Sequence, residues 1–408
     1  MSARRNLILN VVIQTMGAAS SFVVIAALAR LAGPAVQGEY AVFKSLVDVQ
    51  VALLTLGLPS GFVYVINKGL ISTSTLSRWS ARGIPVFLVL GGLITAVYLG
   101  TRSELAEQGV LVTAGLLAVA VAATTFYALL RGIVLTQTDG AGFAWLSAFP
   151  PISLMALAIV GVGMGWWSLA VSFAASSLLA ALAAVMLYRS SALPMARPVD
   201  GSAWGTLRKQ SFHSFLQGLF QSGAIFATIA VMQGLGARVI DIGHFNVASL
   251  AVVGPNLLVA MIAPVLYSRW TKTLTRAGRR PLISRSLRMA VVMQVLALML
   301  LPVITPLLTF LLGADYRPAA VAMMPLLLAV LPLAATRIIA PALQATGDTS
   351  VATVAWGIRL AAPFVLMPLA WMIDDIVLWA TVITAIAEYA ALVAMLLLAA
   401  RRSRLSPA

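Results

Sequence analysis

The chain contains no cysteine among its 408 residues. This absence excludes disulfide bonds, zinc sites with thiolate ligands and catalysis by a thiol. Charged residues are also scarce, at 10% of the sequence, and only 12 residues are acidic. The sequence has no glycine-rich loop with a phosphate-binding lysine, no metal-spaced cluster of His and Asp, and no long soluble segment that could hold an ATPase. These absences predict a protein that is not an enzyme and that uses no metal and no cofactor.

Apolar residues, in contrast, make up 61% of the sequence and gather into long runs. A helix needs about 20 apolar residues to cross the hydrocarbon core of a bilayer. The runs are continuously apolar, whereas the strands of a membrane barrel alternate. The predicted fold class is therefore all-α, a polytopic membrane protein of about twelve transmembrane helices. The predicted spans lie near residues 7–31, 40–66, 83–100, 109–130, 142–163, 166–188, 211–235, 243–268, 289–312, 318–345, 350–372 and 375–400.

The lysines and arginines predict the orientation of these spans. With the N-terminus inside, twenty of the 27 fall in cytoplasmic segments, and only Arg30, Arg102, Arg238 and Arg317 fall in outer loops. This bias predicts that both termini are cytoplasmic, and it accounts for the formal net charge of +15. The basic loop 269–288 lacks any base-reading pattern, so we expect anionic membrane lipids and no nucleic acid as its partner.

A long polar interruption divides the chain into two halves. Residues 189–210 contain two prolines, two glycines and four cations, which is typical of a linker. The predicted domains are an N-lobe of six helices at 1–188, this cytoplasmic linker, and a C-lobe of six helices at 211–408.

A sequence repeat supports this division. Gly38 is followed by Pro59 at the same separation at which Gly243 is followed by Pro264, and each segment opens a span that enters from the outside. A parallel repeat implies a pseudo-two-fold axis along the membrane normal and a site between the lobes.

Three segments carry a resemblance to a known family. They are LAGPAVQGEYAVFKSLVDVQVALLTLGLPSGFVYVIN (31–67), GHFNVASLAVVGPNLLVAMIAPVLYSRW (243–270) and LGADYRPAAVAMMPLLLAVLPLAATRIIAPALQATGDTSVA (312–352). Together they resemble the Wzx-type polysaccharide flippases. These belong to the multidrug/oligosaccharidyl-lipid/polysaccharide exporter superfamily, which also holds the lipid II flippases and the multidrug and toxin extrusion (MATE) antiporters. The resemblance covers the whole chain in arrangement.

The resemblance implies a MATE-like fold of two six-helix bundles forming a V around a cationic cavity. It implies a flippase that moves a polyprenyl-diphosphate-linked oligosaccharide, an O-antigen or exopolysaccharide repeat unit, to the outer leaflet by alternating access. The expected location is the bacterial cytoplasmic (inner) membrane. A polysaccharide polymerase and a chain-length regulator of lipopolysaccharide or exopolysaccharide synthesis are expected partners.

Two other functions remain open. A cation-coupled multidrug antiporter has the same fold, but the first span, 7–31, has no carboxylate, where those antiporters usually place an acidic coupling residue. A porter of the major facilitator type needs an acidic signature between its second and third spans. Residues 67–83 lack that acid, although GRRP at 278–281 echoes part of the signature.

Five ionisable residues fall within predicted spans, where each costs about 2.5 to 3.5 kcal/mol on insertion scales. They are the candidate substrate-binding residues Lys44, Asp48, Arg337, Arg359 and Glu388. Lys44 and Asp48 share a helix face and form either a self-neutralising pair or a sugar and phosphate contact. Arg359 and Glu388 both lie near mid-bilayer, as a structural ion pair or as a gating or diphosphate-binding pair. Arg337 either snorkels to the interface or binds phosphate.

Overall fold

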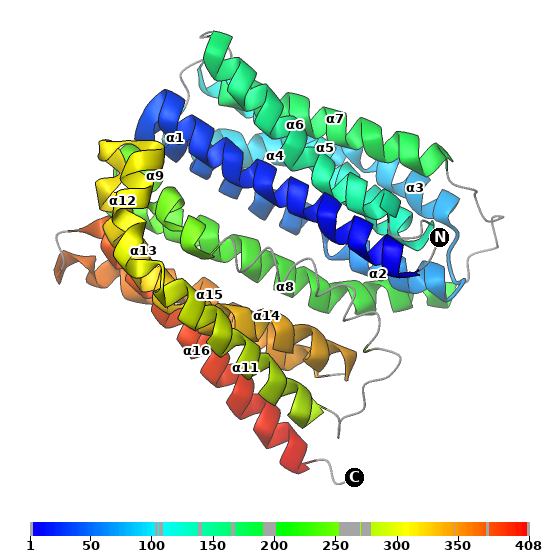
Figure 1. Ribbon diagram of the computed structural model, residues 1–408. Helices are drawn as coiled ribbons and strands as arrows, with labels where there is room; N and C mark the ends of the chain where they lie inside the picture. Colours follow the sequence, from blue (N-terminus) through cyan, green and yellow to red (C-terminus); the bar gives the residue numbers. More distant parts are fainter. Residues whose placement is uncertain are drawn as a thin grey trace. The chain divides into compact units, whose positions relative to one another are not determined.

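The computed structural model describes residues 3–102, 105, 109–137, 141–164, 168–190, 201–252, 270, 279–346, 348–372 and 375–405. Within these residues every regular element is a helix (Figure 1). The helices form two compact units, which are described separately below. Unit 1 comprises Met1–Leu31 with Phe43–Ser222, and unit 2 comprises Ala32–Val42 with Gly223–Ala408.

Helix α5 (Val110–Gln137) is the centre of unit 1. It packs against α2 (Leu58–Asn67), α3 (Thr73–Arg82), α4 (Ile84–Gly100), α6 (Ala141–Met164) and α7 (Leu169–Ser190). Its buried face is rich in alanine, which lets neighbouring helix backbones approach closely. The fully buried Gln50 of α1 donates through Nε2 to the hydroxyl of Thr95 of α4 (3.0 Å), which links these two helices inside the unit.

Helix α1 (Ala3–Thr55) is one run of 53 residues, about 80 Å at a rise of about 1.5 Å per residue. That length exceeds the roughly 30 Å of a bilayer core. The run is broken at Gly33, whose φ of 81° is a left-handed conformation that favours glycine. Pro34 follows and restarts the helix, since proline suits the first helical turn. The loop expected between the first two spans is therefore a one-residue kink.

Unit 2 begins with the segment of α1 after this kink, which crosses α9 (Val239–Ala248) at two glycines. A Cβ built on Gly38 would lie 1.9 Å from the carbonyl oxygen of Val239, and one built on Gly243 would lie 2.0 Å from that of Pro34. These are the two glycines that the sequence repeat matches. The repeat-related helices therefore meet at backbone contact, which only residues without a side chain permit.

The remaining elements of unit 2 run from α11 to α16. They are α11 (Arg279–Leu298), α12 (Leu301–Leu312), the 3₁₀ turn η2 (Ala314–Tyr316), α13 (Arg317–Leu328), α14 (Val330–Ala345), α15 (Thr349–Leu366), the 3₁₀ turn η3 (Met367–Met372) and α16 (Ile376–Leu405). Helix α8 (Gly201–Gly234) contributes to both units, and residues 201–210 of the predicted linker are its first turns. Residues 191–200 of that linker lie outside the described residues.

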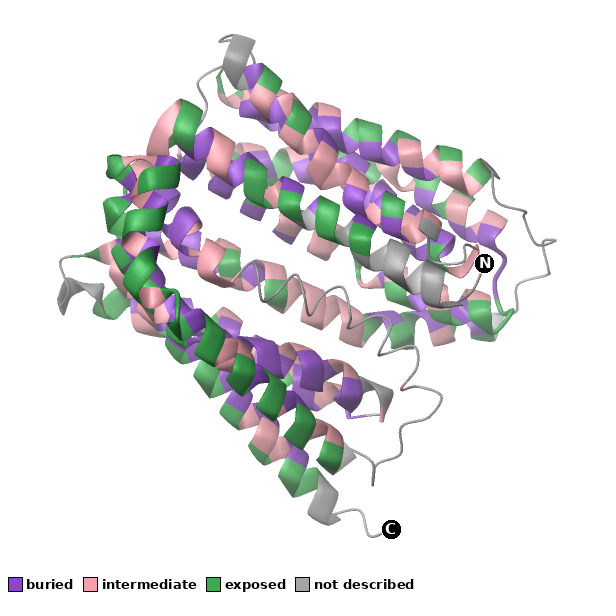
Figure 2. Cartoon of the chain, viewed as in Figure 1, coloured by how far each residue is buried: buried purple, intermediate pink, exposed green. Residues whose placement is uncertain are grey.

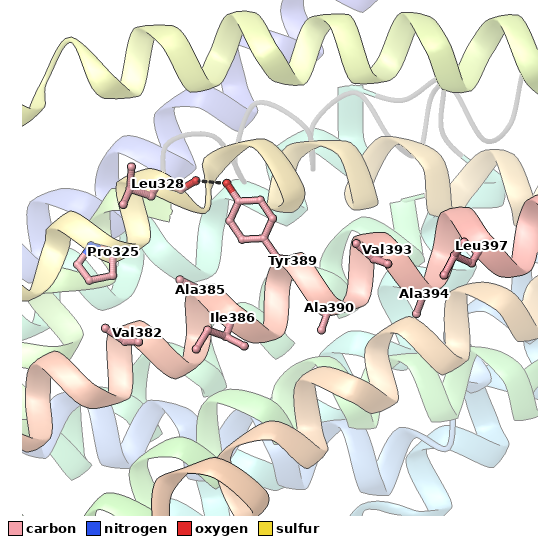
Figure 3. A pocket seen from close by; sticks show the side chains of 10 residues that line it. All are labelled: Pro325, Leu328, Val382, Ala385, Ile386, Tyr389, Ala390, Val393, Ala394 and Leu397. Carbon is pink, nitrogen blue, oxygen red and sulfur yellow. Dashed lines mark hydrogen bonds between the residues drawn. The ribbon is translucent and has the colours of Figure 1, made fainter. Parts of the chain in front are cut away.

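The span formed by α13 and α14 bends by 51° at Ala329. Side chains of neighbouring helices replace the backbone hydrogen bonds that are lost at this bend. Gln294 of α11 donates to the carbonyl of Leu327 (2.9 Å) and accepts from the N–H of Leu331 (2.9 Å), so it stands in for one helical hydrogen bond. Pro332 has no N–H to offer Leu328, whose carbonyl instead accepts from the hydroxyl of Tyr389 (2.8 Å; Figure 3). These side-chain hydrogen bonds therefore stabilise the bend, since an unsatisfied backbone group in hydrocarbon is costly.

We expect Gln294→Leu to destabilise the protein by about 2 kcal/mol, because it keeps most of the side-chain volume but leaves the Leu327 carbonyl and the Leu331 N–H without a partner. The measurement is thermal unfolding of the purified protein in detergent. Val295→Ala, at an exposed position on the same helix, is the control and should change the unfolding temperature far less. Equal unfolding temperatures for the two variants would show that the bend does not need Gln294.

Among the described residues, eight helices are long and apolar enough to cross a membrane, or up to ten when each bent pair is one span. The prediction of twelve differs for two reasons. The first two predicted spans are merged in α1, and most of the predicted span 243–268 lies outside the described residues.

The exposed helix faces in Figure 2 support a membrane setting. Within residues 289–298 of α11 and 386–400 of α16 the exposed positions are apolar apart from the hydroxyl of Tyr389, and they include Val292, Leu296, Val393 and Leu397. Such continuous apolar surface is typical of lipid contact and untypical of a protein in water.

Candidate functional site

Three helices of unit 2 bring together three of the five candidate residues. Helix α14 carries Arg337, α15 carries Arg359, and α16 carries Glu388. The three helices pack against one another in pairs over a core that is mostly alanine. These small side chains allow the helices to approach closely enough for charged side chains to meet between them.

Arg359 is the centre of this charged cluster. Its Nη2 donates to Glu388 Oε2 and to the hydroxyl of Thr336 (2.6 Å). The guanidinium carbon lies 4.1 Å from the centre of the Trp356 ring, one turn earlier on the same helix face. Arg359, Glu388 and Thr336 are all buried. A buried ion pair of this kind is strongly coupled, since removing either partner leaves the other charge uncompensated.

Arg337 adds a second cation to the same aromatic ring. Its guanidinium carbon lies 5.0 Å from the centre of Trp356, which attracts a cation through the negative face of the ring. No described carboxylate lies within ion-pair distance of Arg337, and its Nε has no hydrogen-bond partner among the described residues. The two guanidinium groups thus lie on one aromatic ring, and only that of Arg359 is paired with a carboxylate. The cluster, defined by Thr336, Arg337, Trp356, Arg359 and Glu388, carries one positive charge in excess.

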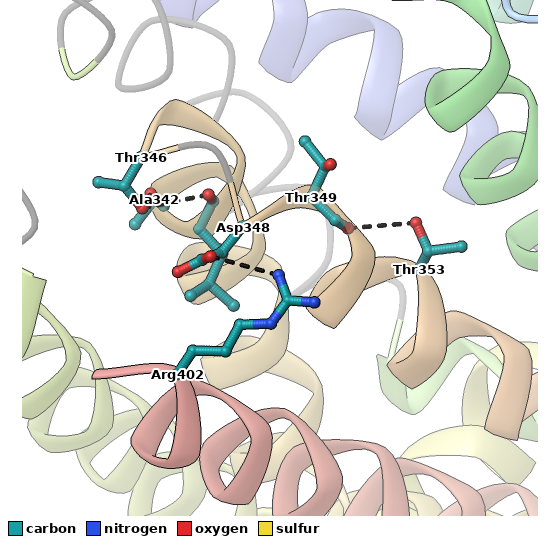
Figure 4. Close-up of polar contacts among 7 residues, drawn as sticks. Ala342, Thr346, Asp348, Thr349, Thr353 and Arg402 are labelled. Carbon is teal, nitrogen blue, oxygen red and sulfur yellow. Dashed lines mark hydrogen bonds and ion pairs between the residues drawn. The ribbon is translucent and has the colours of Figure 1, made fainter. Parts of the chain in front are cut away.

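A second ion pair holds two of these helices at their ends (Figure 4). Arg402 Nη1 on α16 lies 3.3 Å from Asp348 Oδ1, directly before α15. The backbone N–H of Asp348 donates to the carbonyl of Leu343 (2.8 Å) and closes α14. Since the Arg402 side chain is 46% exposed, the pair contributes at most about 1 kcal/mol. It links the start of α15 to the end of α16.

The other two candidate residues, Lys44 and Asp48, belong to unit 1. Lys44 Nζ and Asp48 Oδ2 are 2.5 Å apart on α1, one turn from each other. Their side chains are 47% and 46% exposed, so the pair contributes only about 0.3 to 0.5 kcal/mol. The self-neutralising pair expected from their spacing is therefore present.

The face of α16 opposite Glu388 is apolar. A groove of about 800 Å³ runs between α13 and α16, lined by residues such as Pro325, Ala385, Ile386 and Val393 (Figure 3). Tyr389, next to Glu388 in sequence, reaches into this groove, but its hydroxyl is held by the Leu328 carbonyl. The charged cluster and the groove therefore lie on different faces of one helix.

Two members of the cluster were not among the predicted residues. Thr336 reads as an ordinary polar helix residue, because threonine in an apolar span most often bonds its own backbone, as it also does here to Leu333 (3.1 Å). Trp356 is the only described tryptophan that stacks with an arginine side chain. The signal for it was its position three residues before Arg359 in mid-span, away from the interfaces where tryptophan usually gathers.

No family model matches the sequence, and no curated protein matches it. Solved structures share its fold. A mutant of the MATE transporter VcmN from Vibrio cholerae gives a TM-score of 0.69 at 14% identity, covering 98% of this chain and 98% of that chain. Lipid II flippase MurJ in an inward closed conformation gives 0.68 at 13% identity, covering 96% of this chain and 86% of that chain. An inward-facing multidrug resistance MATE family transporter of the MOP superfamily gives 0.65 at 14% identity, covering 97% and 98%.

The chain is therefore a multi-pass membrane protein with the fold that MATE transporters and MurJ share. The predicted fold class, an all-α membrane protein with a MATE-like transporter fold, is confirmed. At 13 to 14% identity the likeness shows the fold alone, so the cargo has to be argued from the residues of this chain.

Proposed function

We propose that the protein is a Wzx-type flippase. It moves a polyprenyl-diphosphate-linked oligosaccharide, an O-antigen or exopolysaccharide repeat unit, from the cytoplasmic to the outer leaflet of the bacterial inner membrane by alternating access. The observation that carries this proposal is the positive excess of the buried cluster around Arg359. An arginine without a carboxylate partner is expensive in a membrane span and is therefore a functional feature by default. The fold shared with a lipid II flippase is consistent with such a cargo.

The guanidinium groups suit the headgroup of this cargo. An arginine side chain is planar and donates two parallel hydrogen bonds, which matches phosphate oxygens. Arg337 and Arg359 lie on one aromatic ring, so together they offer two such forks at one place. Lys44 and Asp48 are proposed as a second contact, with phosphate or sugar hydroxyls, on the N-lobe. In this proposal residues 1–188 and 211–408 are the two alternating lobes and 189–210 is their linker. A polymerase and a chain-length regulator would act on the exported unit.

The alternative is a cation-coupled multidrug antiporter, which the fold shared with MATE transporters favours. The charge of the cluster disfavours it, because an excess of buried positive charge repels a cationic drug. The predicted first span, residues 7–31, also has no carboxylate that could bind a coupling cation. A porter of the major facilitator type would have a different fold.

We expect Arg337→Ala to lower surface glycan about tenfold or more in cells that depend on this protein, because a charge-assisted hydrogen bond contributes about 1.5 to 3 kcal/mol. Protein abundance in the membrane should not fall, since no described carboxylate loses its partner. Arg317→Ala, at an exposed arginine of α13, is the matched control and should export normally. Full export by Arg337→Ala would show that this residue is not part of the proposed site.

The proposed orientation places both termini in the cytoplasm, and it is directly testable because the chain has no cysteine. Single cysteines at Ala314 and Arg238 should react with an impermeant maleimide in intact cells, because the positive-inside bias puts both outside. Cysteines at Lys68 and Ser202 should react only after the membrane is opened. The reverse pattern of labelling would invert the proposed topology.

A further inference from the structure

The ion pair between Arg359 and Glu388 has a consequence for how an anion could bind. The guanidinium of Arg359 already holds one carboxylate, so Glu388 occupies the place that a phosphate oxygen would take. Nη2 is shared between this carboxylate and Thr336, whereas Nε of Arg359 has no partner among the described residues. An incoming phosphate therefore has to displace Glu388 from Arg359 before it gains both donors of the fork.

Charge balance decides what happens to Glu388 after displacement. The headgroup of a polyprenyl-diphosphate-linked sugar has two phosphodiester-like groups and carries two negative charges at neutral pH. With Glu388 ionised, the two arginines leave only one positive charge to meet them. With Glu388 protonated, the two guanidinium groups balance the two phosphates. Since an uncompensated charge in a span is expensive and a buried carboxyl without a cation favours its neutral form, the balanced state is the protonated one.

Among the described residues, Glu388 is the one carboxyl of this cluster that could take up a proton. Arg359 is the only titratable residue of α15, Arg337 is the only titratable residue of α14, and η3 has none. If the cluster takes up a proton when it binds an anion, Glu388 is therefore the residue that binds this proton. Further titratable groups with described side chains occur on α16 and on the helices packed against it. They lie near the ends of their helices or already have a hydrogen-bond partner: Arg317, Asp241, His244, Tyr389, Arg401 and Arg402.

We propose that Glu388 is an internal competitor of the substrate: a diphosphate displaces it from Arg359, and the freed carboxylate takes up one proton from the buffered solvent. The contact of Arg359 with Glu388 breaks, a contact of Arg359 with a phosphate oxygen forms, and one Glu388 oxygen becomes an O–H. Binding of the anionic headgroup is thereby linked to proton uptake. This inference rests on the proposed function, since it requires that the cluster binds a diphosphate.

The test is calorimetric titration of the full-length protein in detergent with farnesyl-diphosphate-linked N-acetylglucosamine. This probe carries no group that titrates between pH 5.5 and 8, so protons counted from the heats in buffers of different ionisation enthalpy come from the protein. We expect wild type to take up about one proton per probe bound, so that affinity rises up to about tenfold per unit fall in pH. Glu388→Gln should bind with no proton uptake and no pH dependence, whereas Asp315→Asn, at an exposed carboxylate, should behave as wild type.

The outcomes separate the two proposals. Binding by wild type without proton uptake overturns the role of Glu388 and leaves the flippase standing. Proton uptake that persists in Glu388→Gln overturns it equally, and the wild-type proton count decides the matter if that variant does not fold. If wild type does not bind the probe at any pH, the proposed function fails and this inference fails with it.

Discussion

Arg359→Ala is expected to reduce the amount of folded protein sharply, because it strands the carboxylate of Glu388 among three packed helices. Breaking a buried ion pair by removing one partner costs about 3 to 5 kcal/mol. The contact to Thr336 and the stacking on Trp356 are lost at the same time. The measurement is the abundance of protein in the membrane fraction together with the unfolding temperature in detergent. Lys44→Ala removes a half-exposed partner and serves as the matched comparison, with an unfolding temperature close to that of wild type.

The double variant Arg359→Ala with Glu388→Ala separates a structural role from a binding role. Removing both charges leaves no uncompensated group, so abundance should return to near the wild-type level. Export should not return to the wild-type level, because one of the two bidentate donors for phosphate is gone. Arg359→Lys should keep only part of the export, since an ammonium group cannot reproduce a planar fork. Restored export in the double variant would make the pair purely structural.

Gly243→Ala is expected to reduce the amount of folded protein about as much as Arg359→Ala does, because the new methyl group has no space. The new methyl group would lie 2.0 Å from the carbonyl oxygen of Pro34, and a backbone atom cannot move aside as a flexible side chain can. The helices α1 and α9 would have to separate, at a cost that we place above about 3 kcal/mol. Gly38→Ala should be similar, because its methyl group would lie 1.9 Å from the carbonyl oxygen of Val239.

The control for these glycines is Gly115→Ala, where a Cβ would meet no atom within 4 Å. That variant should be as abundant as wild type, or slightly more stable, because alanine favours a helix over glycine. Unfolding temperatures of the purified variants in detergent provide the comparison. If Gly243→Ala and Gly115→Ala unfold at the same temperature, the two helices do not meet at Gly38 and Gly243.

Hydrophobic run length was sufficient to predict the class of fold, since a bilayer leaves few alternatives to long apolar helices. It was not sufficient for the kink at Gly33. Residues 32–39 contain Gly, Pro, Gln and Glu, a composition typical of a loop, yet Pro34 restarts the helix at once and Gly38 lets α9 pack against it. That packing partner lies about two hundred residues away in sequence, which local signals do not report.

The candidate site was also predictable only in part, because the sequence does not show which helices pack together. Charged residues in apolar spans are rare, so Arg337, Arg359 and Glu388 stood out in the sequence. Thr336 and Trp356 have ordinary roles in most helices, and only the approach of α14 to α15 brings both to Arg359. Gln294 and Tyr389 are similar cases, because their partners are backbone groups freed by a bend that depends on tertiary packing.

The proposed function is the movement of an anionic lipid-linked sugar across a bilayer. Its most direct test uses proteoliposomes of the purified full-length protein that contain a fluorescent polyprenyl-diphosphate-linked oligosaccharide in both leaflets. An impermeant glycosidase, added outside, reports how much of the lipid reaches the outer leaflet. We expect near-complete digestion with wild type and digestion of only about half of the lipid without protein or with Arg337→Ala. Half digestion with wild type, together with movement of ethidium driven by a cation gradient, would contradict the flippase and establish the antiporter.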